Sequence, residues 1–344
     1  MAIASGARDD ETIRAGIERW IRAHEPDAAE AVVEPLTRPA VGLSSDTSFV
    51  TAVWPSGHRR RSVLRLPPAG DGLFPEYDLG VQVDRQEALR AAGIATAPAR
   101  FEADDSWLGA PFMVMPRVPG EVLANNPSYL RAGWLFDGGE PRQRHVIDAF
   151  LTTLGTLHRV APAAVGAEPE PLAATVERWC AYLDWAATGG PVPDYLARAR
   201  DWCVAEVPTV DAPDSVLWGD VQLANCVFAE TGDVAALLDF ELTGTGPAEV
   251  DLGWFLALHA MTVATSGPDL PGFGDRASML VTYEAALGRP VAPLRWFEVF
   301  AMLRSGSIMV RIARLLAARG VDDSWLTRGN PTAAALENLL ASEE

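Results

Sequence analysis

The sequence predicts an α+β protein in which a strand-rich N-terminal part precedes a larger and mainly helical part. Short apolar runs that end at proline or polar turns dominate the chain as far as Pro116. Beyond Gly120, apolar residues recur at helical spacing, and joints rich in proline and glycine at 189–191 and 268–274 separate the helices. With 344 residues and no internal repeat, the chain is long enough for two lobes around one cleft.

The N-terminal part opens with a predicted amphipathic helix over 10–23, in which Ile13, Ile17 and Trp20 share one face. Strands, a further helix and a last strand then follow. The predicted strands are 32–36, 50–54, 62–66 and 111–115, and the helix is 78–92.

The mainly helical part contains seven segments with helical periodicity. They are 142–159, 171–187, 192–206, 249–265, 275–287, 293–317 and 331–342. We expect the aromatic residues at helical spacing in these segments to belong to the core.

Three polar side chains interrupt the otherwise apolar stretch 216–241, namely Asp220, Asn225 and Asp239. The two apolar runs of this stretch, joined by a Glu-Thr-Gly-Asp turn, predict a β-hairpin that places Asn225 and Asp239 side by side. An amide oxygen beside a carboxylate suits Mg²⁺, and Asp220 would lie one loop away as a proton acceptor. Turn and cap roles are the alternative for each residue alone, but they do not require this spacing.

The motifs around these residues resemble the aminoglycoside phosphotransferase and choline kinase-like family, which has the protein-kinase-like fold. Kinase catalytic loops share the Asp-x-x-x-x-Asn spacing and the later metal aspartate. The strand at 108–115 is most similar to the branch related to kinase domains attached to acyl-CoA dehydrogenases. The matching pieces are Trp218-Gly219-Asp220, Asn225, Asp239-Phe240-Glu241, Gly246-Pro247 and Asp251-Leu252-Gly253.

This resemblance implies two lobes, a nucleotide-binding lobe over 1–117 and a helical lobe over 118–344 that holds the catalytic loop and acceptor pocket. It implies transfer of the γ-phosphate of ATP or GTP to a hydroxyl of a small molecule, with Mg²⁺. Asp220 would be catalytic, and Asn225 and Asp239 would hold the metal. The acceptor would be a hydroxyacyl-type metabolite, and the alternatives are an antibiotic kinase for aminoglycosides or macrolides and a nucleotide-binding pseudokinase.

The nucleotide contacts are also implied by the resemblance. Ser44, Ser45 and Asp46 would form the tip of a phosphate-covering loop over 42–48. Arg65 stands where the family carries a phosphate-binding lysine, and arginine can also bind phosphate through its planar fork. Gln82 stands where that lysine's glutamate partner is usual, which would leave a weaker charge–amide hydrogen bond and motivates the pseudokinase alternative.

Further residues take their expected roles from the same resemblance. Met115, Pro116 and Val118 would form the hinge that binds adenine through the backbone. Trp218 replaces the usual histidine of the catalytic loop and is expected to pack in its place. Asp251 is expected to cap a helix and brace the catalytic loop. His158 lies where the family often ends a helix with Leu-His, and it is expected to make a structural hydrogen bond.

Composition excludes several other classes of function. The net charge of −18 opposes nucleic acid binding and is compatible with a cationic small substrate. No run approaches a membrane span, and without a recognisable signal peptide the expected location is the cytoplasm. The three cysteines are too few for a disulfide framework or a zinc site. We expect Arg304 and Arg311 to be solvated. The oligomeric state is left open.

Overall fold

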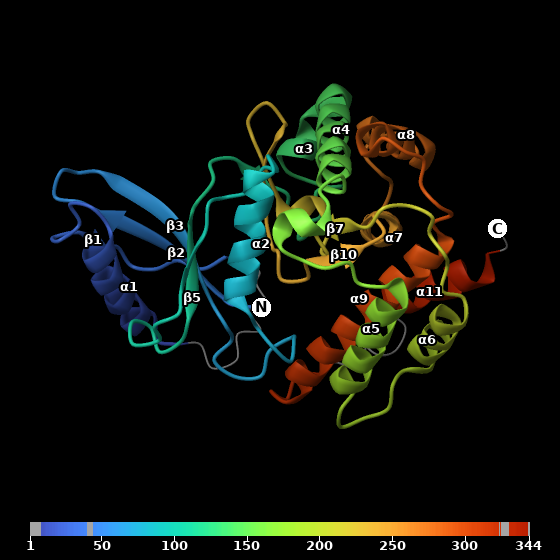
Figure 1. Ribbon diagram of the computed structural model, residues 1–344, viewed down its shortest axis with the longest axis horizontal. Coiled ribbons are helices and arrows are strands. Elements are labelled where there is room, and N and C mark those ends of the chain that lie inside the picture. Colours follow the sequence, from blue (N-terminus) through green and yellow to red (C-terminus); the bar gives the residue numbers. More distant parts are fainter. Residues whose placement is uncertain (1–7, 40–43, 323, 325–329, 343–344) are drawn as a thin grey trace. The chain divides into compact units, whose positions relative to one another are not determined.

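The computed structural model describes residues 8–39, 44–322, 324 and 330–342. The chain divides into two compact units (Figure 1). The first comprises Met1–Glu87 and Ala97–Val118, and the second comprises Ala88–Thr96 and Pro119–Glu344. The first unit ends one residue after the lobe boundary expected at residue 117, and the short segment Ala88–Thr96 packs with the second unit.

The first unit is built on a five-stranded antiparallel sheet with the strand order β1-β2-β3-β5-β4. Helix α1 (Asp10–His24) begins at Asp9, whose carboxylate accepts a hydrogen bond from the backbone N–H of Thr12. The apolar side of α1 packs on one face of the sheet, and α2 (Leu79–Ala91) contributes Leu79 and Val83 to a smaller cluster on the other face. The strands are β1 (Val32–Val33), β2 (Asp46–Val53), β3 (Arg59–Leu66), β4 (Arg100–Glu102) and β5 (Phe112–Pro116).

Alternation along β3 decides which side chains meet which helix. Leu64 and Leu66 belong to the α1 cluster, whereas Val63 packs with the α2 cluster. Arg65 therefore lies on the α2 face of the sheet, and it is buried there.

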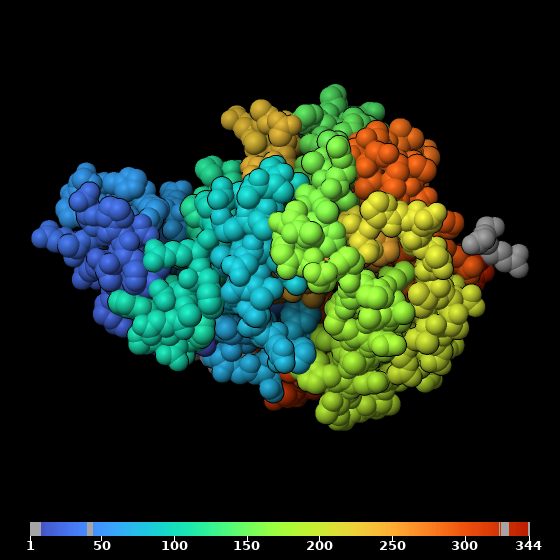
Figure 2. All heavy atoms as spheres, viewed as in Figure 1, coloured from blue at the N-terminus to red at the C-terminus, as the bar shows by residue number. Residues whose placement is uncertain are grey.

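The second unit is mainly helical and contains the larger core. Helix α9 packs against α5, α6, α7 and α11, while α4 packs against α8 (Figure 1). Residues of α5 and α6 form one continuous part of the surface, coloured lime green in Figure 2. The helices are α3 (Trp134–Asp137), α4 (Gly139–Leu157), α5 (Leu172–Ala186), α6 (Asp194–Ala205), α7 (Glu249–Ser266), α8 (Arg276–Leu287), α9 (Arg295–Ala317) and α11 (Pro331–Ala341).

Two small antiparallel sheets complete the second unit. One has the order β6-β8-β9, and the other pairs β10 with β7. Short 3-10 turns lie at Pro162–Val165, Leu223–Asn225 and Pro271–Phe273. The strands are β6 (Glu121–Val122), β7 (Ser215–Leu217), β8 (Cys226–Phe228), β9 (Val234–Leu237) and β10 (Gly244–Gly246).

The predicted α+β class and the seven predicted helices of the helical part are confirmed. The prediction of a hairpin over 216–241 is confirmed only for the second half of this stretch. β8 and β9 form it, whereas β7 pairs with β10 instead. The first run could not continue as one strand, because the chain turns sharply after β7. Among the residues that the structure describes, every helix is too short or too polar to cross a lipid bilayer.

Candidate active site

A loop between β7 and β8 carries Asp220. It leaves the buried strand β7 through Gly219, whose φ of +94° is costly for any residue with a side chain. A Cβ at Gly219 would also lie 2.1 Å from the carbonyl oxygen of Leu242. Glycine is therefore required here both by the turn and by the close approach of the neighbouring backbone.

A buried hydrogen-bond network holds the start of this loop. The Asp251 carboxylate accepts the backbone N–H of Trp218 at 2.6 Å and that of Gly219 at 3.1 Å. Nε2 of His158 lies 3.1 Å from the same carboxylate, and Nδ1 lies 2.6 Å from the Tyr283 hydroxyl. Burial raises the pKa of Tyr283, so its hydroxyl donates to Nδ1 and the imidazole donates through Nε2 to Asp251.

This network tests two expectations. Bracing of the catalytic loop by Asp251 and a structural hydrogen bond from His158 are both confirmed. The cap role of Asp251 is wrong, because α7 begins at Glu249 with Ala248 as its N-cap and without a side-chain cap. The carboxylate is turned toward the loop instead of its own helix.

Trp218 joins the loop to the other half of the site. Its indole is fully buried and packs in the main core, as expected for the replacement of a histidine. Nε1 donates to the carbonyl of Leu238 at 2.7 Å, and the N–H of Leu238 donates to the carbonyl of Asn225 at 2.8 Å. The residue before Asp239 is thus tied both to the catalytic loop and to Asn225.

Three donors fix the orientation of the Asp220 carboxylate. Gln222 Nε2 and Trp254 Nε1 donate to Oδ1 at 2.6 and 3.1 Å, and Asn225 Nδ2 donates to Oδ2 at 2.8 Å. Burial, and next the negative charge of Asp239, nevertheless raise the pKa of Asp220 above its ordinary value. The side chain is therefore an oriented carboxylate that is more basic than a free aspartate.

Asn225 and Asp239 lie at adjoining ends of the β8–β9 hairpin. Cys226 pairs with Leu237, so Asn225 just precedes one strand and Asp239 closely follows the other. The Asn225 amide nitrogen also donates to the backbone carbonyl of Asp220 at 3.1 Å, which leaves its Oδ1 for another partner. Asp239 has φ +60°, an uncommon backbone conformation for a residue other than glycine.

The donor set at this hairpin end fits Mg²⁺. It comprises one carboxylate and one amide oxygen, both hard oxygen ligands. Within the described ranges, no group of three or more His, Cys, Asp or Glu side chains could hold a metal ion. Such a two-residue set is suited to an ion whose coordination is completed by phosphates and water, and unsuited to a closed structural metal site.

Two residues that contact this site were given no role there by the sequence analysis. Trp254 lies three residues after Asp251 on α7 and so shares its helix face, a spacing that could have indicated it. Arg304 on α9 is buried, although we expected it to be solvated. Its guanidinium lies 4.4 Å from the Trp254 ring and 4.7 Å from the Trp179 ring, and it donates to the carbonyl of Gly219 at 3.0 Å.

Burial lowers the pKa of Arg304 to about 10, so the group remains charged at neutral pH. A charged guanidinium between two indoles is stabilised by the ring quadrupoles. It holds the carbonyl of Gly219, directly before Asp220, whereas Asp251 holds the N–H of the same residue. An arginine on a long helix has no sequence feature that would distinguish it from a surface residue.

In the first unit, the structure brings Arg65 and Ser45 together. Arg65 Nε donates to Ser45 Oγ at 3.0 Å, and Ser45 Oγ lies 3.1 Å from Thr47 Oγ1. Thr47 is also the direct cross-strand neighbour of Arg65. Ser44, next to this group, is buried. Residues 42 and 43 of the predicted phosphate-covering loop lie outside the described residues.

Two predicted members of the nucleotide site are placed differently from expectation. Asp46 is the first residue of β2 and not a loop tip, and alternation points its side chain away from the Arg65 face. There its carboxylate forms an ion pair with Arg38. The buried Oε1 of Gln82, the acceptor atom of this amide, has no hydrogen-bond partner in the described chain, so Gln82 does not accept from Arg65.

The predicted hinge lies at the end of β5. Met115 is buried in the cluster beneath α2, and Pro116 is the last residue of the strand. The N–H of Arg117 still bonds to β3, through the carbonyl of Arg61 at 2.9 Å. Val118 follows beyond this last ladder bond, half-buried against the same cluster as Met115.

Comparison with known proteins agrees with this geometry. A profile of the phosphotransferase enzyme family matches residues 35–295. The human protein acyl-CoA dehydrogenase family member 11 is 27% identical over 201 residues, which are 56% of this chain and 24% of that protein. The chain thus aligns with about a quarter of the length of this curated relative.

Solved structures are similar over nearly the whole chain. A candidate aminoglycoside phosphotransferase from Ralstonia eutropha has a TM-score of 0.72 at 23% identity, covering 96% of this chain and 98% of its own. Choline kinase LicA from Streptococcus pneumoniae has a TM-score of 0.60 at 13% identity, covering 95% and 98%. At these identities the likeness supports the fold, while the family profile supports the class of enzyme. The chain belongs to the phosphotransferase enzyme family and has the protein-kinase-like fold.

Proposed function

We propose that the protein transfers the γ-phosphate of ATP or GTP to a hydroxyl of a small molecule, with Asp220 as the catalytic base. The observation that supports this most directly is the Asp220–Asn225 hydrogen bond at the end of the hairpin that also carries Asp239. Phosphoryl transfer needs little covalent chemistry from the protein, and it depends on positioning and on charge stabilisation. These three side chains supply a proton acceptor and oxygen ligands in one place.

The proton of the acceptor hydroxyl goes to Oδ2 of Asp220. Oδ1 already accepts two hydrogen bonds, from Gln222 and Trp254, which use its two lone pairs. Oδ2 accepts one, from Asn225, and so retains one lone pair. The raised pKa of Asp220 makes that oxygen a better base at neutral pH than an ordinary carboxylate.

Asn225 Oδ1 and the Asp239 carboxylate are the proposed Mg²⁺ ligands. When bound, the metal neutralises charge on the nucleotide phosphates. Trp218 contributes by holding the Leu238 carbonyl, because this contact fixes the backbone from which Asp239 projects.

Arg65 is proposed to bind the α- and β-phosphates, with the Ser45 hydroxyl orienting its guanidinium. Ser44 belongs to the same phosphate-binding segment in this proposal, and Met115, Pro116 and Val118 form the adenine hinge. Asp46 is excluded from the nucleotide contacts because its carboxylate is on the opposite face and is neutralised by Arg38.

For the acceptor we favour a hydroxyacyl-type metabolite, because the human relative is named as a member of the acyl-CoA dehydrogenase family. The alternative is an aminoglycoside or macrolide antibiotic, and of these two the likeness to the Ralstonia eutropha structure favours an aminoglycoside. A pseudokinase is the weaker alternative. It is motivated by Arg65 and Gln82, yet the complete and oriented set of Asp220, Asn225 and Asp239 favours turnover.

The experiment is a phosphoryl-transfer assay with ATP or GTP, with and without Mg²⁺, on hydroxyacyl thioesters, aminoglycosides and macrolides. Mg²⁺-dependent formation of a phosphorylated acceptor, detected by ³¹P NMR, is the expected result, with hydroxyacyl thioesters as the best class. Phosphorylation of an antibiotic alone would replace the metabolite proposal. Nucleotide binding without any transfer across the panel would support a pseudokinase.

A further inference from the structure

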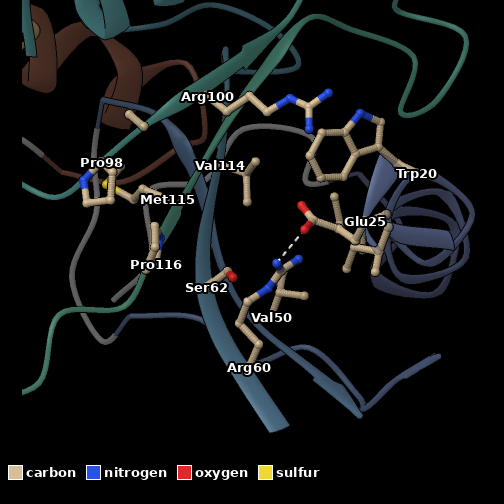
Figure 3. A pocket seen from close by; sticks show the side chains of 13 residues that line it. Trp20, Glu25, Val50, Arg60, Ser62, Pro98, Arg100, Val114, Met115 and Pro116 are labelled. Carbon is tan, nitrogen blue, oxygen red and sulfur yellow. Dashed lines mark hydrogen bonds and ion pairs between the residues drawn. The ribbon is translucent and has the colours of Figure 1, made fainter. Parts of the chain in front are cut away.

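A cavity of about 200 Å³ lies in the first unit, on the α1 face of the sheet (Figure 3). Its walls come from α1, from strands β2, β3 and β5, and from the segment 98–100. Most of the lining is apolar, contributed by Ile17, Trp20, Ile21, Val50, Val114 and Pro98. A cavity of about 150 Å³ is enough to bind benzene, so this space admits a compact organic molecule.

Three charged side chains line the cavity, and one of them forms no ion pair within the described residues. Arg60 forms an ion pair with Glu25 at 2.7 Å, drawn as a dashed line in Figure 3. Arg100 has no ion-pair or hydrogen-bond partner in the described part of the chain. Its guanidinium lies 4.8 Å from the Trp20 ring, and two arginines against one glutamate give the lining itself one positive charge. The Glu102 carboxylate, which is outside the lining, interacts electrostatically with Arg100.

The ring beneath Arg100 is itself fixed in place. Trp20 Nε1 donates to the Glu102 carboxylate at 2.8 Å, and the ring packs edge-on against Phe112. Ser62 adds a hydroxyl to the lining that is without a hydrogen-bond partner among the described residues. The cavity therefore has mostly apolar walls, of which the Trp20 ring is fixed in place. It also presents the exposed guanidinium of Arg100 and the hydroxyl of Ser62, unbonded within the described residues.

We propose that this cavity binds a compact monoanion with an apolar body, of the class of small aromatic carboxylates. The ring would be buried against Ile17, Val50 and Val114, while the carboxylate pairs with Arg100. Charge-assisted hydrogen bonds between a guanidinium and a carboxylate supply orientation, and the buried apolar area supplies affinity.

This site lies away from the proposed phosphate contacts, although Met115 and Pro116 of its lining also belong to the proposed adenine hinge. Ser62 and Arg60 lie on the α1 face of β3, whereas Arg65 lies on the α2 face. Helix α1, which forms one wall, also precedes the family-matched region 35–295. A ligand here would contact β3 and β5 without occupying the phosphate-binding face.

Benzoate, benzamide and acetate are the probes for this proposal. They would be titrated into the full ¹⁵N-labelled chain while the Trp20 indole N–H signal, assigned by its loss in Trp20→Phe, is followed. We expect benzoate to shift this signal saturably and to bind about tenfold more tightly than neutral benzamide, because only the carboxylate pairs with Arg100. Acetate, which lacks the ring, should bind least. Equal affinity for benzoate and benzamide, or no shift with benzoate, would overturn the proposal.

Arg100→Gln should weaken benzoate binding about tenfold and leave benzamide binding unchanged. The matched control is Arg61→Gln, which removes an exposed arginine of β3 that does not line the cavity. Val114→Trp, which fills the cavity, should abolish binding of both ring compounds. Equal weakening by Arg100→Gln and Arg61→Gln would mean general charge attraction and would refute the site. The benzoate-to-benzamide ratio in the unaltered protein remains decisive even if a variant fails to fold.

Discussion

The proposed catalytic loop and the proposed phosphate-binding segment of the first unit are held in different ways. The loop before Asp220 is fixed by buried groups from two helices, with Asp251 of α7 accepting its backbone N–H groups and Arg304 of α9 donating to its backbone carbonyl. The segment at Ser44–Thr47 is held by hydroxyl contacts and by the end of the β2–β3 ladder. The first arrangement is a buried charged network. In the second, the contacts on the Arg65 face are neutral or singly charged, while Asp46 pairs with Arg38 on the opposite face.

This difference indicates that the loop before Asp220 is held more rigidly than the segment Ser44–Thr47. Groups that must meet a transferring phosphoryl group benefit from positions fixed before the substrate arrives. Contacts to the remaining phosphates can be completed on binding, because charge pairing tolerates adjustment of long side chains. Changes in the catalytic loop should therefore affect turnover and folding, whereas changes around Arg65 should affect nucleotide affinity.

Asp220→Asn tests the proposed catalytic loop and should have the largest effect on turnover. We expect turnover to fall by about 10²–10⁴-fold, because the amide cannot accept the hydroxyl proton. Nucleotide binding should be retained, since Asp220 lies outside the proposed phosphate ligands. Steady-state kinetics and calorimetric titration with nucleotide measure the two effects. Near-normal turnover in this variant would remove Asp220 from its proposed role.

Asp251→Ala should have the largest effect on stability. It leaves two backbone N–H groups and His158 without their acceptor in a fully buried site, and we expect a loss of about 3 kcal/mol in the free energy of unfolding. Urea denaturation followed by circular dichroism measures it. Asp233→Ala, at an exposed turn, is the matched carboxylate control and should stay close to the unaltered protein. Equal stability of both variants would contradict the role of the buried network.

Arg65→Gln tests the proposed phosphate-binding segment of the first unit. The KM for ATP should rise about tenfold with kcat much less changed, because a charge that binds phosphate is removed while the catalytic loop is intact. Asp46→Asn, which alters the neighbouring carboxylate on the opposite face of the sheet, should leave the KM for ATP unchanged. If both substitutions raised KM alike, the assignment of these two residues to opposite faces would fail.

Trp254→Phe should cause the smallest change, in the pH profile. Activity requires ionised Asp220, and the raised pKa of that group places the acid limb of kcat above the range of an ordinary aspartate. The Trp254 hydrogen bond lowers this pKa, so its removal should move the acid limb to still higher pH. The pH dependence of kcat measures the shift. Movement of the limb to lower pH would show that the indole does not stabilise the carboxylate.

Sequence reasoning reached the elements whose signal is local. Periodicity located the long helices, because each needs a continuous apolar face wherever it packs. The order of short motifs indicated the catalytic hairpin and the loop before it. It missed Arg304, since a buried cation depends on which aromatic rings surround it, and that is decided by helices distant in the sequence. It misplaced Asp46, because the exact start of a strand fixes which face a side chain takes.

The sequence by itself determined the α+β class and the family resemblance, and it selected Asp220, Asn225 and Asp239 as the proposed catalytic and metal-binding residues. These follow from spacing and residue type, which are properties of neighbours along the chain. Only the tertiary structure decided that β7 leaves the hairpin to pair with β10, that Trp254 and Arg304 support the catalytic loop, and that a cavity opens beneath α1. Those features depend on packing between segments far apart in sequence, where shape and burial choose among partners that are equivalent in composition.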